Sequence, residues 1–72
     1  MVKPTRVTNS IGDLRQTHGL TQGELAERVG VTRQTINAIE QSKYSPTLEL
    51  AFQIARVFSA PIESVFSYPK ES

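Results

Sequence analysis

The sequence predicts an all-α domain of five short helices. Apolar residues recur at the three- and four-residue spacing of a helix in successive stretches, and threonine side chains stand where helices would begin. Glycine or proline stands where those helices would end. The chain of 72 residues is long enough for one small domain with a core of marginal stability, so we also expect it to dimerise.

The composition argues against several classes of function. There is no cysteine, and the one histidine, His18, has no other ligand candidates nearby, so we expect no metal, no cofactor and a reducing cytoplasm. The sequence offers no nucleophile with a base and no glycine-rich phosphate loop, so we expect no enzyme. No apolar run is long enough for a membrane span or a signal peptide. The net charge of +1 argues only against strong binding to nucleic acid regardless of sequence.

Residues 1–8 predict an extended arm, because β-branched residues follow Pro4 and no helical period is visible. Three interpretations of the arm stay open. It is a loosely held terminus, a short strand paired with another extended segment, or a DNA contact through Lys3 and Arg6.

The first helix is expected over residues 9–17. Thr8 or Asn9 would cap its start, and Gly19 would follow its end. Two apolar side chains one turn apart would face the core, namely Ile11 and Leu14.

The stretch TQGELAERVGVTRQTINAIEQSKY, residues 21–44, predicts two short helices joined by a tight glycine turn. Thr21 and Glu24 have the spacing of a capping box, in which each side chain bonds the other's backbone N–H. Gly30 stands where a helix ends in the left-handed conformation, and Thr32 caps the next helix directly afterwards. Two helices joined this tightly must cross steeply.

The exposed face of the second helix in this pair is rich in amides. At about 100° per residue, Ile36 and Ile39 share the buried face. The opposite stripe and the residues beside it carry one arginine and almost no acidic side chains. These residues are Arg33, Gln34, Thr35, Asn37, Ala38 and Gln41. Amides can pair with adenine, arginine with guanine, and a small apolar side chain with a thymine methyl. This face therefore suits the edges of DNA bases.

Two further helices are expected to complete the core. The fourth would run from its N-cap Thr47 to about Phe58, after a polar loop broken by Pro46. Its predicted inner stripe consists of Leu48, Ala51, Ile54, Ala55 and Phe58. A short fifth helix would span residues 61–66 with Pro61 in its first turn. The apolar residues expected on the surface, where a partner would bind, are Phe52, Val57, Val65 and Phe66.

The stretch TQGELAERVGVTRQTINAIEQSKYSP resembles the Cro/repressor helix-turn-helix family, also called the xenobiotic-response-element family. The likeness continues through Leu14-Arg15 upstream and SPTLELAFQIARVF downstream, and it is similar to the compact single-domain subgroup. It implies a five-helix lambda-repressor-like fold whose second and third helices read DNA. It also implies a structural ion pair between Arg15 and Glu40. We therefore divide the chain into an arm (1–8), a DNA-binding domain (9–66) and a C-terminal tail (67–72).

The main hypothesis is a transcriptional regulator that binds double-stranded DNA in a sequence-specific way. The residues expected to read bases are Arg33, Gln34, Thr35, Asn37 and Ala38. Those expected to contact phosphates are Gln22, Thr32, Gln41, Lys43 and Tyr44. One domain offers few base contacts, so useful specificity calls for a homodimer on a two-fold operator. The resemblance implies that the output is repression.

A second hypothesis is a protein-interaction module, such as the antitoxin of a toxin–antitoxin pair or a coactivator-like adaptor. The exposed apolar residues would then bind an unlike protein instead of a second copy. If a homodimer forms, the fifth helix and the tail could build it, with the arm from Lys3 to Thr8 pairing against the segment from Phe66 to Tyr68. We expect no membrane partner and no small-molecule effector.

Overall fold

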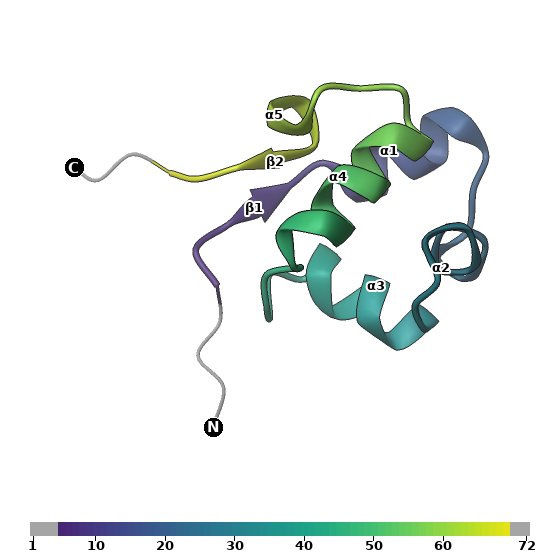
Figure 1. Ribbon diagram of the computed structural model, residues 1–72, viewed down its shortest axis with the longest axis horizontal. Coiled ribbons are helices and arrows are strands. Elements are labelled where there is room, and N and C mark those ends of the chain that lie inside the picture. Colours follow the sequence, from purple (N-terminus) through teal and green to yellow (C-terminus); the bar gives the residue numbers. More distant parts are fainter. Residues whose placement is uncertain (1–4, 70–72) are drawn as a thin grey trace.

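The computed structural model describes residues 5–69 of the chain. Within this range the chain forms five short helices and one pair of two-residue strands (Figure 1). In chain order these elements are β1 (Thr8–Asn9), α1 (Ile11–His18), α2 (Gln22–Val29), α3 (Arg33–Glu40), α4 (Leu48–Val57), α5 (Ile62–Val65) and β2 (Phe66–Ser67). The strand pair and α2 lie on opposite sides of α4 (Figure 1). The predicted helical class is confirmed, and the extended segments near the two ends are the strands.

The predicted caps position α2, α3 and α4. The Thr21 hydroxyl accepts a hydrogen bond from the Glu24 N–H at 3.1 Å, and the Glu24 carboxylate accepts one from the Thr21 N–H at 2.9 Å. The bond from the Thr21 backbone is the main reason that the pKa of Glu24 lies below its ordinary value. Thr32 and Thr47 cap α3 and α4 in the same way, through their hydroxyls.

The start of α1 differs from the prediction. The helix begins at Ile11 after Ser10, so neither Thr8 nor Asn9 is its N-cap. These two residues form β1 instead, because β1 pairs with β2 and holds them extended. Asn9 still assists the start of the helix, since its Oδ1 accepts a hydrogen bond from the Ile11 N–H at 3.1 Å.

The two strands pair antiparallel within one chain, with Thr8 opposite Ser67 and Asn9 opposite Phe66. The arm does pair with the segment after the fifth helix, as one interpretation of the sequence had it, but the pairing requires no second copy. Lys3, which the arm was expected to bring to DNA, lies outside the described residues. The division of the chain at residues 8/9 and 66/67 stays a prediction, and the strand pair crosses both boundaries.

The core lies between α4 and the other helices. Its buried apolar residues are Ile11, Leu25, Ala26, Ile36, Ile39, Leu50, Ala51, Ile54, Ala55, Phe58 and Val65. Two predictions about α4 and α5 were wrong: Leu48 is 71% exposed instead of facing inward, and Val65 is 1% exposed instead of facing a partner. Apolar residues surround most of α4, so the pattern alone does not determine its buried face. Leu50 shares a groove with Val29 of α2.

Candidate nucleic-acid interface

The tight turn between α2 and α3 fixes which face of α3 is exposed. Gly30 has φ 76°, in the left-handed region that glycine adopts at low cost, and the following Val31 N–H donates to the Ala26 carbonyl at 3.0 Å. Beyond the turn, Ile36 and Ile39 of α3 are buried in the core. The opposite face of α3 is therefore turned outward along its whole length.

A shallow hollow of about 280 Å³ follows this outward face. Its lining residues are Arg33, Gln34, Asn37, Ala38 and Lys43. Tertiary structure thus brings four of the five predicted base readers together with the lysine of the loop after α3. None of these five side chains is acidic, and two are cationic, which favours a polyanion at this surface.

The loop after α3 is shaped by an uncommon backbone conformation. Ser42 has φ 58°, in the left-handed region, and the next N–H, that of Lys43, donates to the Ala38 carbonyl at 2.9 Å. This turn closes the C-terminal end of α3 in the manner of a left-handed helix cap. It also folds Lys43 back beside the hollow.

Two of the residues predicted to contact DNA lie outside the hollow along α3. Thr35 and Tyr44 line a different groove, of about 420 Å³, which runs between the turn and α4. The Thr35 hydroxyl is 3.0 Å from the Thr32 hydroxyl, and Tyr44 packs against the core. A base contact by Thr35 and a phosphate contact by Tyr44 stay predictions.

The other residues predicted to contact phosphates lie at the ends of the two helices, and their contacts with phosphate stay predictions. Gln22 is the first residue of α2 and is half-buried, Thr32 precedes α3 and is exposed, and Gln41 follows α3 and is exposed. Gln22 and Gln41 are both hydrogen bonded to Asn37, with distances of 3.3 Å from Asn37 Nδ2 to Gln22 Oε1 and 2.8 Å from Gln41 Nε2 to Asn37 Oδ1.

Arg15 and Glu40 form the ion pair that the resemblance implied. The guanidinium donates to both carboxylate oxygens, from Nε at 2.6 Å and from Nη2 at 3.1 Å, and Nη1 donates to the Leu20 carbonyl at 3.1 Å. The side chains are 17% and 13% exposed. The hydrogen bond to Glu40 raises the pKa of Arg15 above its ordinary value, although burial acts in the opposite direction. The pair joins α1 to the C-terminal end of α3.

Asn9 is a contributor that the sequence did not reveal. Its Nδ2 donates to the Ile39 carbonyl at 2.8 Å and to the Glu40 carbonyl at 3.5 Å, across 30 and 31 residues of chain. These carbonyls belong to the last turn of α3, where carbonyls lack the N–H partners that lie inside the helix, and the Ile39 carbonyl also accepts from the Ser42 N–H at 3.0 Å. An asparagine next to a helix signals a local cap, but nothing in the pattern indicates a partner in another helix.

A family model described as helix-turn-helix matches residues 11–65, which include all five helices. The chain belongs to the helix-turn-helix family. The resemblance in the sequence is thereby confirmed. Relatives in the family include an HTH-type transcriptional regulator of Methanocaldococcus jannaschii, which is 52% identical over 60 residues spanning 83% of this chain and 91% of that protein. Another, from Bacillus subtilis, is 45% identical over 64 residues, spanning 89% of this chain and 97% of that protein.

A solved structure from a bacterium has the same fold. A transcriptional regulator from Listeria innocua superimposes with a TM-score of 0.73 at 22% identity, and the match covers 90% of this chain and 64% of that one. Within residues 5–69, no helix is long and apolar enough to cross a membrane, and no three histidine, aspartate or glutamate side chains are grouped as metal ligands. In this helix-turn-helix chain the cationic, amide-lined face of α3 is the candidate site.

Proposed function

We propose that this protein is a sequence-specific regulator of transcription that places α3 in the major groove of duplex DNA. The observation that carries the proposal is the hollow along α3, where Arg33, Gln34 and Ala38 stand beside Lys43. A major groove admits an α-helix, and these side chains suit guanine, adenine and the thymine methyl in turn. The first helix of the helix-turn-helix unit, α2, would cross the phosphate backbone.

A selection of bound sequences from random duplex DNA tests this function. The wild type should enrich one motif, and Arg33→Ala and Gln34→Ala should each relax the preference at a base pair that the wild type reads, by about 1–3 kcal/mol. Matched controls are Arg56→Ala and Gln53→Ala, which remove an arginine and a glutamine side chain from the exposed surface of α4. Failure of the wild type to enrich any motif would contradict the proposal.

Lys43 is proposed to contact phosphate, so its loss should weaken binding equally for all sequences. Lys43→Ala should reduce the slope of log affinity against log salt by about 1. Arg56→Ala removes the same charge from a surface remote from the hollow and should leave the slope unchanged. An unchanged slope for Lys43→Ala would count against the phosphate contact.

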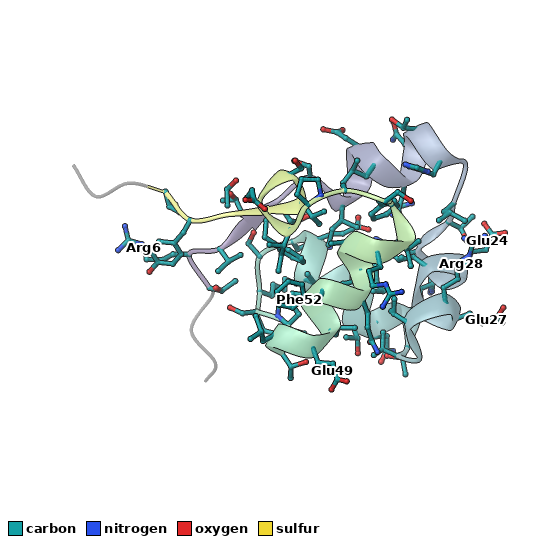
Figure 2. The ribbon with its side chains drawn as sticks, turned by 45° about the horizontal axis from the view of Figure 1, so that its top comes forward. Arg6, Glu24, Glu27, Arg28, Glu49 and Phe52 are labelled. Carbon is teal, nitrogen blue, oxygen red and sulfur yellow. The ribbon has the colours of Figure 1, made fainter. Side chains whose placement is uncertain are left out.

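The active form is proposed to be a homodimer on a two-fold operator that represses by blocking polymerase. An uncovered apolar surface on one side of α4 supports dimerisation: Leu48 is 71% and Phe52 is 50% exposed, and a groove of about 250 Å³ lies beside Leu48 with Phe66 on its wall. Figure 2 shows Phe52 on this helix, well apart from the charged side chains of α2. Half-sites would lie about 34–36 Å apart. Sedimentation equilibrium should give a dimer that Leu48→Glu shifts to monomer.

A protein-interaction role is the second candidate. The antitoxin HipB of Escherichia coli is 37% identical over 51 residues, spanning 71% of this chain and 58% of that protein. The same apolar side of α4 would then bind an unlike protein. Copurification from the native host separates the two roles: a stable unlike partner favours the second candidate, and a homodimer that shifts DNA by itself favours the regulator.

A further inference from the structure

A continuous line of side-chain hydrogen bonds runs from α1 to the exposed face of α3. Arg15 binds the Glu40 carboxylate, and the Glu40 Oε1 also accepts a bond from Gln22 Nε2 at 3.2 Å. Gln22 Oε1 accepts from Asn37 Nδ2 at 3.3 Å, and Asn37 Oδ1 accepts from Gln41 Nε2 at 2.8 Å. Three amides are thus linked in series to one ion pair.

The carboxylate sets the direction of every amide in this line. An ionised glutamate is an acceptor only, so Gln22 must turn its NH₂ group toward Glu40 and its carbonyl oxygen toward Asn37. Asn37 must then present its own NH₂ group to Gln22, which leaves its carbonyl oxygen for Gln41. The orientation of Asn37 is therefore determined by the ion pair beneath α3.

Asn37 and Gln34 differ in this respect. A paired contact with adenine needs an amide that can turn its oxygen and its NH₂ group toward the base together. The amide of Asn37 would break its bonds to both neighbouring glutamines in turning. Gln34 is exposed, and its side chain has no hydrogen-bond partner within residues 5–69. Its amide is free to turn toward a base.

We propose that Asn37 is a positioning residue and not a base reader. It passes the direction that Glu40 sets at Gln22 on to Gln41, and its bonds hold both glutamine amides in place. Each amide nitrogen uses one N–H in the line and retains another for a phosphate oxygen. Base preference then comes from Arg33, Gln34 and Ala38. This inference rests on the proposed function, because it assigns roles within the same DNA-binding surface.

Base preference distinguishes the two roles. Asn37→Ala should lower affinity by about two- to tenfold and leave the preference at every position of the selected motif unchanged. Gln34→Ala, the matched comparison, should relax the preference at one base pair of each half-site by roughly 5- to 150-fold. Relaxed preference at one base pair in Asn37→Ala would overturn the inference. A wild type that enriches no motif would overturn the proposed function, and the inference with it.

A measurement without DNA tests the positioning itself. In ¹⁵N-labelled protein, Asn37→Ala should shift the side-chain NH₂ resonances of Gln22 and Gln41 and speed their exchange with water. Gln34→Ala should leave both unchanged, and backbone spectra of the two variants should otherwise match the wild type. Unchanged side-chain resonances in Asn37→Ala would show that Asn37 orients neither glutamine, and would overturn the inference even if DNA binding is confirmed.

Discussion

The two ends of α3 are held in different ways. The N-terminal end is held by the turn and by its own cap, where the Thr32 hydroxyl accepts the Thr35 N–H at 3.2 Å. The C-terminal end is held by residues distant in the chain, with Arg15 bound to the Glu40 side chain and Asn9 bound to the Ile39 and Glu40 carbonyls. We call the C-terminal end, held by distant residues, the fixed end of α3, and the N-terminal end, held by local contacts, the exposed end.

The largest expected effect comes from breaking the ion pair at the fixed end. Arg15→Ala leaves the Glu40 carboxylate mostly buried without its cation, so the free energy of unfolding should fall by about 3–5 kcal/mol. Urea denaturation followed by circular dichroism measures the loss. The double variant Arg15→Met with Glu40→Leu leaves no unpaired charge and should lose much less. A loss below about 1 kcal/mol in Arg15→Ala would place the pair among ordinary surface pairs.

The next effect comes from Asn9, which serves both α1 and α3. Asn9→Ala should lower the free energy of unfolding by about 1–3 kcal/mol, because partners in the two helices lose their hydrogen bonds. Asn9→Asp separates the two roles, since it keeps an oxygen for the Ile11 N–H but brings a carboxylate to the α3 carbonyls. It should be no more stable than Asn9→Ala. Wild-type stability in Asn9→Asp would show that the bonds to α3 contribute nothing.

A substitution at the exposed end of α3 should lower the free energy of unfolding less than one at the fixed end. Thr32→Ala removes the cap of a single helix and should cost about 1 kcal/mol in a thermal or urea melt without DNA. Thr32→Ser keeps the hydroxyl and should remain near the wild type. If Thr32→Ala costs as much as Arg15→Ala, the contrast between the two ends is wrong.

The smallest expected effect is a gain in the free energy of unfolding. Ser42 closes the C-terminal end of α3 with φ 58°, a conformation that disfavours residues with a Cβ atom. Ser42→Gly should therefore raise the free energy of unfolding by up to about 1 kcal/mol. Ser64→Gly, within α5, makes the same exchange in a right-handed helix and should lower it by roughly 0.5–1 kcal/mol. A loss in Ser42→Gly would show that the serine side chain contributes to the turn.

Local patterns in the sequence were enough to predict most of the helix-turn-helix unit. Thr21, Glu24, Gly30 and Thr32 act on neighbours within four residues, so their roles depend little on the rest of the chain. The buried positions of Ile36 and Ile39 also follow from helical spacing alone. The family resemblance added the ion pair between Arg15 and Glu40, which no local rule provides.

Tertiary structure decided what depends on contacts between distant segments. It drew Thr8 and Asn9 out of the expected first helix, because their strand partners lie 57 and 59 residues away. It buried Leu50, which shares a groove with Val29 of α2, and left Leu48 exposed on a different groove of α4. It also tied the amide of Asn37 to α2 while leaving that of Gln34 free. The sequence by itself determined which helix carries an exposed face of amides, because helical spacing is a local property, and packing decided which of those amides is free to turn.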